Sequence, residues 1–339
     1  MERELISIVV PAHDEEQCLP DLHREIRRVL ETEAERYEWE LIIVDDGSTD
    51  RTPAVIEELA ASDPRIRGVH LTRSFGQQAA LLAGLEASRG TVVTMDADLQ
   101  QPPAAIPGML RLHEEGFQIV HGVRRDHPDT GWYKRTTSRW FYLVFGFLSR
   151  IPMEPGMLDF KLMSREVVET VLEMPEADFF LRGVAAWVGF KQARLPFQSD
   201  LRRAGTTKYS TRAMVAFAIR GITSFSTFPL HLATVLGVVM TFVSLGYGGY
   251  VTVRHFLWAH PQPGYASTVV LIAFLMGVQF LLIGVLGEYV GRIHVEVKRR
   301  PRYVVARTTE CSKGAQNLPK SEKPPPLSEA VGVSPRLRE

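Results

Sequence analysis

Two carboxylates at the end of a short apolar run are the side chains in this sequence best suited to chemistry. The segment 91–103 reads TVVTMDADLQQPP, and its apolar first half predicts a strand that ends in Asp96 and Asp98. Side chains alternate between the two faces of a strand, so this spacing places both carboxylates on one side. Carboxylates held this close repel each other and suit a hard divalent cation such as Mg²⁺ or Mn²⁺, with Gln100 as a further oxygen ligand. A bare Asp-x-Asp pattern also occurs in solvated turns, and the surrounding chain decides between the two interpretations.

Apolar runs and helical patterns alternate along the first part of the chain. Strands are predicted at 5–10, 40–44, 66–71, 91–95 and 117–121. Helices are predicted at 15–30, 52–61, 76–88 and 104–115. This alternation predicts an α/β fold, a Rossmann-like and mostly parallel sheet with helices on both faces.

The ends of three predicted strands carry polar or turn residues, at 11–15, 45–48 and 96–100. Ligands of open α/β sheets bind beyond the carboxyl ends of the strands, so these segments are expected to form one site. No G-x-G-x-x-G follows the first strand, and no G-x-x-x-x-G-K-[ST] occurs anywhere. Both absences argue against a dinucleotide-binding domain and a P-loop protein.

Composition excludes several classes of protein. The 339 residues carry a formal net charge of zero, which gives no indication of bulk nucleic-acid binding. The two cysteines, Cys18 and Cys311, lie far apart and form no metal or redox pattern, so a reducing compartment is expected. The start of the chain, MERELISIVV, lacks the features of a secretory signal peptide.

Two almost wholly apolar runs, 229–253 and 268–291, follow a polar first part of the chain. At a rise of about 1.5 Å per residue each can cross a bilayer, although a helical hairpin in a protein core is an alternative. A basic cluster follows the second run: Arg292, Lys298, Arg299, Arg300 and Arg302. The positive-inside rule therefore places the tail, 292–339, and the domain before the first run in the cytoplasm. The tail is expected to be disordered from about 308.

Other segments suggest how a site is completed. Residues 206–228 have the pattern of an amphipathic helix at a membrane surface. The basic segment 121–139 is either a solvated loop or a lid that binds anions. Asp159 interrupts the apolar segment 157–164, and a carboxylate there is costly unless it is paired. Asp159 is therefore a candidate site residue.

Together these motifs resemble the family 2 glycosyltransferases of GT-A fold. They are most similar to the polyprenyl-phosphate group, which includes dolichyl-phosphate mannose synthase and the bacterial undecaprenyl-phosphate glucosyltransferases. The resemblance covers about 6–305 and rests on ordered strings: IVVPAHDEE, IIVDDGSTD, FGQQAALLAGLEASRG, DADLQQPP, DF at 159–160, LRG at 181–183, RAGTTKY and GEYVGRIHVEVKRRPRY. Two positions depart from the family pattern, since Asp14 replaces a usual Asn and Gln101 a frequent Asp.

The resemblance implies a cytoplasmic catalytic domain at 1–205 and a role for individual residues. The residues expected to bind the nucleotide sugar are Pro11, Asp14, Glu16, Asp46 and Asp96. Those expected to bind the acceptor phosphate are Arg124, Arg135 and Ser138. The catalytic set would be Asp98, Asp159, Arg203 and Lys208, with Mg²⁺ or Mn²⁺ held by Asp98 and Gln100. Guanidinium groups suit phosphate oxygens, in agreement with these roles.

The implied activity is the inverting, metal-dependent transfer of a sugar from a nucleotide sugar, such as UDP-glucose, to undecaprenyl phosphate. It would take place at the cytoplasmic face of the plasma (inner) membrane, in a multi-pass homo-oligomer (dimer or tetramer) that supplies lipid-linked sugar for cell-envelope glycosylation. One alternative is a mannosyltransferase that uses GDP-mannose. Another is a processive polysaccharide synthase, whose Q-x-x-R-W motif is missing from this sequence. The last is a membrane-anchored subunit that binds a nucleotide sugar without turnover.

The chemistry of the acceptor bears on Asp159. A phosphate monoester has a second pKa near ~6 and is largely dianionic at neutral pH, so it needs little help from a general base. We therefore expect Asp159 mainly to orient groups of the site, by pairing with Arg203 or Lys208.

Overall fold

A mixed sheet forms the centre of the α/β part of the chain. The computed structural model describes residues 3–124, 157–174, 176, 180–198, 228–257 and 264–309. Within these residues the sheet has eight strands in the order β7-β5-β6-β4-β1-β2-β3-β8. The strands are β1 (Glu4–Ala12), β2 (Tyr37–Asp45), β3 (Ile66–Leu71), β4 (Thr91–Thr94), β5 (Ile119–Arg124), β6 (Met157–Met163), β7 (Gln192–Phe197) and β8 (Val305–Thr309).

The strands β4, β1, β2 and β3 are parallel neighbours, as predicted. Between β4 and β5 lies β6, which is antiparallel to both. The helices of the α/β part are α1 (Leu19–Leu30), α2 (Thr52–Ser62), α3 (Gln77–Ala87), α4 (Ile106–Glu114), α6 (Arg165–Leu172) and α7 (Leu181–Trp187). Short 3-10 turns, η1 (Glu31–Glu33) and η2 (Pro103–Ala105), follow α1 and precede α4.

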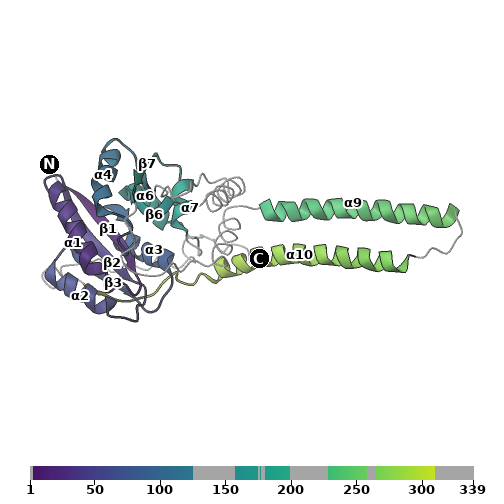
Figure 1. Cartoon of the computed structure of the whole chain (residues 1–339), viewed down its shortest axis with the longest axis horizontal. Coiled ribbons are helices and arrows are strands. Elements are labelled where there is room, and N and C mark those ends of the chain that lie inside the picture. Colours follow the sequence, from purple (N-terminus) through teal and green to yellow (C-terminus); the bar gives the residue numbers. More distant parts are fainter. Residues whose placement is uncertain are drawn as a thin grey trace, which may run out of the picture.

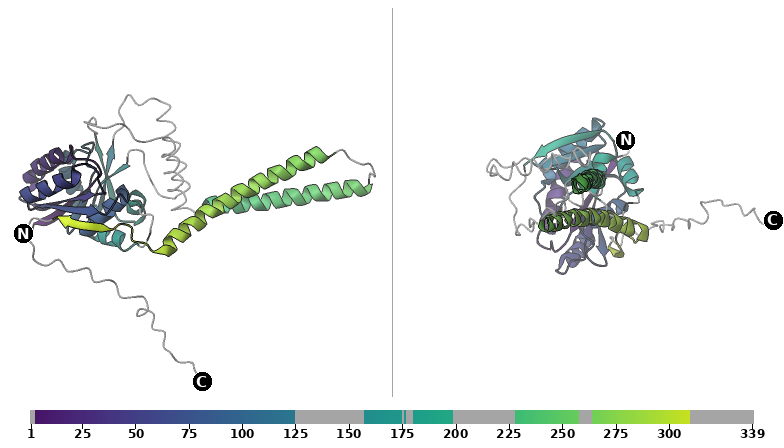
Figure 2. Two further views of the ribbon diagram at one scale, coloured as in Figure 1. Left: turned by 90° about the horizontal axis from the view of Figure 1, so that it is seen from below. Right: turned by 90° about the vertical axis from the view of Figure 1, so that its right-hand side faces the viewer.

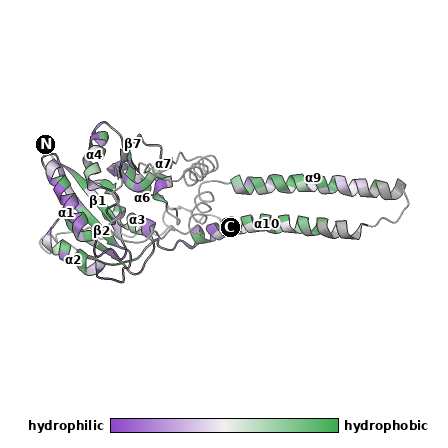
Figure 3. Ribbon diagram, viewed as in Figure 1, coloured by the Kyte–Doolittle hydropathy of each residue, from purple (hydrophilic) through white to green (hydrophobic). Residues whose placement is uncertain are grey.

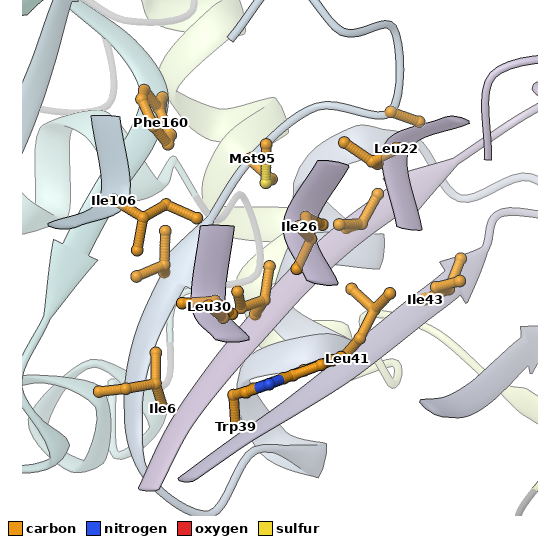
Figure 4. Close-up of a cluster of buried hydrophobic side chains, with 14 of the residues drawn as sticks. Ile6, Leu22, Ile26, Leu30, Trp39, Leu41, Ile43, Met95, Ile106 and Phe160 are labelled. Atoms are coloured by element: carbon orange, nitrogen blue, oxygen red, sulfur yellow. The ribbon is translucent and has the colours of Figure 1, made fainter. Parts of the chain in front are cut away.

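Helices cover both faces of the sheet, which confirms the predicted fold class (Figure 1). On one face α1, α2 and α4 pack on the sheet, and Figure 4 shows Leu22 and Ile26 of α1 in the same buried cluster as Leu41 of β2. The other face is covered by α3, α6 and α7. Strands buried on both faces explain the continuous apolar runs in the sequence, which are typical of parallel sheets.

The helix predicted to begin at Glu15 begins instead at Leu19. The proline in its first turn favours this start. The backbone N–H groups of Glu15 and Glu16 donate to Thr52 Oγ1 (2.9 Å) and to a carboxylate oxygen of Asp50 (3.3 Å). The residues before α1 therefore tie the end of β1 to the loop after β2.

Two long helices, α9 (Phe228–Leu257) and α10 (Tyr265–Lys298), project away from the sheet as a hairpin (Figure 1). Leu230–Tyr250 and Phe274–Lys298 are long and apolar enough to cross a membrane, and no part of either apolar window is buried. Figure 3 shows apolar residues along both helices. The alternative of a hairpin in the protein core is therefore wrong.

The segment after the hairpin differs from the expected tail. Helix α10 continues through Lys298, and 305–309 then forms β8 at the edge of the sheet, next to β3 (Figure 2). Disorder from about 308 is therefore wrong for residues 308 and 309, because their β-branched side chains suit a strand and β3 offers an edge. The predicted amphipathic helix at 206–228 lies, apart from Phe228 at the start of α9, outside the described residues, as do the basic segment beyond Arg124 and the tail beyond Thr309.

Candidate active site

The polar segments predicted to meet do lie at one edge of the sheet. Ala12 pairs in register with Asp45, and Val9 with Thr94, so the carboxyl ends of β1, β2 and β4 lie at the same edge of the sheet. Because β6 runs in the opposite direction beside β4, its early residue Asp159 lies level with the end of β4. The antiparallel strand thus brings a residue distant in sequence to the same edge.

Asp96 is held in a network of glutamines. Its backbone N–H donates to Gln101 Oε1 (2.8 Å), and its two carboxylate oxygens accept from Gln101 Nε2 (2.5 Å) and Gln77 Nε2 (2.7 Å). Burial, together with the negative charges of Asp159 and Asp98, raises the pKa of Asp96 to about 7. Gln101, the residue that departs from the family pattern, therefore has a structural role, since its side chain makes two hydrogen bonds with Asp96.

The donor set on Asp98 and Gln100 fits a hard cation. Asp98 is half-buried, and its Oδ1 accepts from the backbone N–H of Gln100 (3.2 Å). The described part of the chain contains no cluster of three or more His, Cys, Asp or Glu side chains that could hold a metal alone. Mg²⁺ usually binds one or two carboxylates together with waters and substrate phosphates. The excess of negative charge that raises the pKa of Asp96 is what such a cation would relieve.

Asp159 is buried, with 2% of its surface exposed, and it is paired. Its Oδ2 accepts from Arg182 Nη2 (2.8 Å) and Gln78 Nε2 (3.1 Å), and Lys161 Nζ lies 3.9 Å from its Oδ1. Burial alone would raise the pKa of Asp159, but the charges of Arg182 and Lys161 and the two hydrogen bonds outweigh it and hold the pKa below its usual value. Asp159 is therefore ionised at neutral pH.

Arg182 and Gln78 are site residues that the sequence did not single out. Both lie in strings noted only for their resemblance, LRG and FGQQ. Gln78 bridges two elements, since its Oε1 accepts from the backbone N–H of Leu181 (2.9 Å) while its Nε2 reaches Asp159. The sequence did contain a signal for Gln78. Two adjacent glutamines begin an otherwise apolar helix, and that helix starts at the carboxyl edge of the sheet, where polar side chains can reach a ligand site.

The loops after β1 and β2 are bound to each other. Asp14 adopts a left-handed backbone (φ 57°), and its Oδ1 accepts from Thr49 N (2.8 Å) and Asp50 N (3.4 Å). Its own N–H donates to Ser48 Oγ (3.1 Å). Glu16 adds a further link, because its Oε2 accepts from the backbone N–H of Arg51 (3.0 Å). Asp14 and Glu16 therefore hold the loops at 12–16 and 45–51 together as one unit, called the double loop below.

Asp46 holds the loop before α3. It is 4% exposed, and its carboxylate accepts from Ser74 Oγ (2.8 Å), Phe75 N (2.7 Å) and Gly76 N (3.0 Å). The next residue, Gly47, has φ 65°, and a Cβ there would lie 2.4 Å from the carbonyl carbon of Arg73. Only glycine allows this approach. Asp46 thus contributes to the candidate site by holding the backbone of residues 74–76 in place.

The remaining predicted residues divide between described and undescribed parts of the chain. Pro11 is buried in β1, and Arg124 is exposed at the end of β5. Arg135, Ser138, Arg203 and Lys208 lie outside the described residues, and so does the predicted pairing of Asp159 with Arg203 or Lys208. The partners that the structure describes for Asp159 are Arg182, Lys161 and Gln78.

The model of the family "Glycosyl transferase family 2" matches residues 7–172, and that of the "GtrB C-terminal hairpin" matches 228–293. The SfII prophage-derived bactoprenol glucosyl transferase of Shigella flexneri is 40% identical over 304 residues, which cover 89% of this chain and 98% of that relative. This chain belongs to glycosyltransferase family 2. A second similar protein is the prophage bactoprenol glucosyl transferase homolog of Escherichia coli K12, 39% identical over 303 residues (89% of this chain, 98% of the relative). Among solved structures, glucosyl-3-phosphoglycerate synthase from Mycobacterium tuberculosis is 22% identical and covers 65% of this chain and 76% of its own, with a TM-score of 0.42.

Membership of glycosyltransferase family 2 confirms the predicted family, its GT-A fold and the prediction of an enzyme. The interpretation as a subunit without turnover is therefore set aside. The roles of single residues stay predictions, now with a geometry that brings Asp96, Asp98 and Asp159 to one edge.

Proposed function

We propose that this glycosyltransferase moves glucose from UDP-glucose to the phosphate of undecaprenyl phosphate, a polyprenyl lipid. The observation that carries the proposal is the similarity to proteins named bactoprenol glucosyl transferases over 98% of their length, hairpin included. The two apolar helices agree with a lipid acceptor, because they would hold the catalytic part at a membrane surface. The product would be a lipid-linked glucose made at the cytoplasmic face of the inner membrane for envelope glycosylation.

Asp98 and Gln100 would hold Mg²⁺ or Mn²⁺ next to the donor diphosphate. When bound, such an ion stabilises the negative charge that develops on the leaving nucleoside diphosphate. Hydrogen bonds hold both carboxylates in place. Gln77 and Gln101 donate to Asp96, and the backbone N–H of Gln100 donates to Asp98.

The proposed reaction is a single displacement with inversion at the anomeric carbon. A phosphate oxygen of the lipid attacks, and the nucleoside diphosphate leaves. The lipid phosphate carries its negative charge at neutral pH, so no proton has to be removed from the nucleophile. Arg124, which is exposed at the end of β5, is proposed to bind the acceptor phosphate. Arg135, Ser138, Arg203 and Lys208 are proposed to bind phosphates as well.

Asp159 would act in this reaction by holding Arg182. An aspartate whose pKa is held below its usual value is a weak base, whereas an effective general base has a pKa near the working pH. The same ion pair fixes the Arg182 guanidinium at the edge where the phosphates are expected. We therefore propose that Asp159 orients cationic side chains and does not abstract a proton.

The test is an assay with purified, full-length protein in detergent. UDP-[¹⁴C]glucose and undecaprenyl phosphate are supplied with Mg²⁺, and the expected result is radioactivity in an organic extract as a lipid-linked glucose. GDP-[¹⁴C]mannose in the same assay is the control for donor. Labelled lipid from GDP-mannose and none from UDP-glucose would overturn the proposed donor, and labelling without added lipid acceptor would overturn the proposed acceptor. The proposed homo-oligomer is checked on the same sample by its mass in native mass spectrometry.

A further inference from the structure

The chain that follows the apolar hairpin returns to the catalytic sheet and is fastened there. β8 pairs antiparallel with β3, from Gly68 opposite Thr309 to Leu71 opposite Val305. The backbone N–H of Thr72 donates to Val304 O (3.0 Å), and an ion pair joins Arg307 to Glu57 of α2. Figure 2 shows this last described strand along the side of the domain.

His70 of β3 connects this strand to the end of β2. It is 3% exposed, its Nδ1 lies 3.2 Å from Asp45 Oδ2, and its Nε2 lies 3.1 Å from Thr309 Oγ1. An ionised carboxylate can only accept, so Nδ1 carries the proton that is shared with Asp45. In the neutral imidazole, Nε2 then accepts the hydroxyl proton of Thr309.

Asp45 links His70 to the double loop at the candidate nucleotide site through hydrogen bonds. Its Oδ1 accepts from the backbone N–H of Ser48 (2.9 Å), and Ser48 Oγ accepts from Asp14 N (3.1 Å). Burial alone would raise the pKa of Asp45, but hydrogen bonds from His70 and Ser48 hold it below its usual value, so it stays an acceptor. A continuous hydrogen-bonded path therefore runs from Thr309 through His70, Asp45 and Ser48 to Asp14.

The contact between His70 and Thr309 depends on space left by Gly68. A Cβ at this position would lie 3.2 Å from His70 Nε2, 3.2 Å from Thr309 Cβ and 2.6 Å from Ile56 Cγ2. A side chain at position 68 would thus push apart the imidazole, the C-terminal strand and α2. A glycine at position 68 of β3 therefore leaves the room in which His70 meets Thr309.

We propose that Thr309 and His70 are positioning residues for the nucleotide sugar, through which the C-terminal strand sets the conformation of the loops at 12–16 and 45–51. The inference rests on the proposed function, because these loops are taken to bind the donor. A loop fixed before binding loses less conformational entropy when the ligand arrives. Loss of the connection should therefore raise the KM for donor and leave the KM for lipid unchanged.

The first test compares Thr309→Val, which keeps shape and loses the hydroxyl, with Thr309→Ser, which keeps the hydroxyl. Thr308→Val is the matched control, since Thr308 is an exposed neighbour in the same strand. Initial rates are measured with full-length protein against UDP-glucose at saturating undecaprenyl phosphate. Loss of one hydrogen bond predicts a KM for UDP-glucose about three- to tenfold higher in Thr309→Val, with kcat within about twofold. Thr309→Ser and Thr308→Val should match the parent. An unchanged donor KM in Thr309→Val overturns the inference.

The second test does not depend on turnover. Hydrogen exchange is followed by mass spectrometry in peptides that cover 46–51, whose amides at Ser48 and Thr49 are bonded within the double loop. These amides should exchange faster in Thr309→Val and in His70→Leu than in Thr308→Val. Equal exchange in all three proteins refutes the connection. A parent enzyme that transfers no glucose from UDP-glucose refutes the proposed function instead, and the exchange result still decides the inference.

Discussion

Replacement of Asp159 by asparagine separates the two roles that this carboxylate could have. The substitution keeps size and shape but removes the charge that faces Arg182 and Lys161. In the parent, Asp159 Oδ2 accepts a charge-assisted bond from Arg182 at 2.8 Å and a second bond from Gln78 at 3.1 Å. The position of the guanidinium therefore depends on the negative charge of Asp159.

The size of the effect follows from these contacts. A hydrogen bond to a charged partner contributes about 1.5–3 kcal/mol, and a neutral one about 0.5–1.5 kcal/mol. Asparagine can keep one neutral bond, so the loss is about 1–2 kcal/mol, which corresponds to roughly a five- to thirtyfold fall in kcat if Arg182 acts on the transition state. Removal of a true general base predicts a fall of about 10²–10⁴.

The pH dependence distinguishes the roles more sharply than the rate does. The pKa of Asp159 is held below the aspartate value of about 3.9, so this group stays ionised throughout the usual assay range. Two groups then titrate in the acidic range, the lipid phosphate with a second pKa near ~6 and Asp96 with a pKa of about 7. The acidic limb that they give should persist in Asp159→Asn, shifted toward lower pH to the extent that it reports Asp96, because the charge of Asp159 contributes to the raised pKa of Asp96.

The assay measures kcat from pH 5 to 9 at saturating donor and lipid, for the parent, Asp159→Asn and Arg182→Lys. Arg182→Lys keeps the positive charge and loses the fork geometry, so it should resemble Asp159→Asn if the ion pair is what matters. Loss of the acidic limb in Asp159→Asn, with a fall of about 10² or more, would refute the orienting role and establish Asp159 as the base.

Three further predictions concern the metal, folding stability and topology. Asp98→Asn, or excess chelator on the parent, should abolish most turnover while the circular dichroism spectrum is unchanged; full activity in either case would contradict the metal site. His121 is 3% exposed, and burial and the charge of Lys161 lower its pKa to about 4, against about 6.5 in the unfolded chain. The unfolded chain therefore binds an extra proton between these values, and stability should fall by up to about 3 kcal/mol as pH drops from ~6.5 to ~4. Thermal unfolding midpoints of the parent and His121→Gln measure this, and an equal pH slope in both would remove His121 as the cause. A cysteine at Gln262, a position outside the described residues, should react with an impermeant thiol reagent added to intact cells, whereas labelling only after lysis would argue against two spans.

The sequence predicted the parallel half of the sheet well because each strand there is a buried apolar run. The strand at 66–71 has the predicted bounds, and α2 begins at the predicted Thr52. The convergence of the loops after β1, β2 and β4 followed from topology alone, since parallel neighbours end at one edge.

Other features depend on contacts between distant segments and have no local signature. The ion pair of Asp159 with Arg182 joins β6 to α7, and only the three-dimensional fold shows which arginine meets the carboxylate. The helix start at Leu19 was missed because acidic residues before it suit a helix dipole, whereas their amides bond to the neighbouring loop. The short strand β8 lies in a polar tail, where composition favours disorder and a partner strand decides otherwise.

The position of β8 late in the sequence also determines when the sheet can be completed during synthesis of the chain. β3 ends at Leu71, but the strand that covers its outer edge is not made until after Lys298, when both apolar helices have been synthesised. At about 5–20 residues per second, the edge of β3 waits roughly 10–50 s for its partner. Exposed strand edges readily pair with other chains. The catalytic domain therefore keeps an open sheet edge during synthesis, and that edge closes only in a chain that already contains both apolar helices.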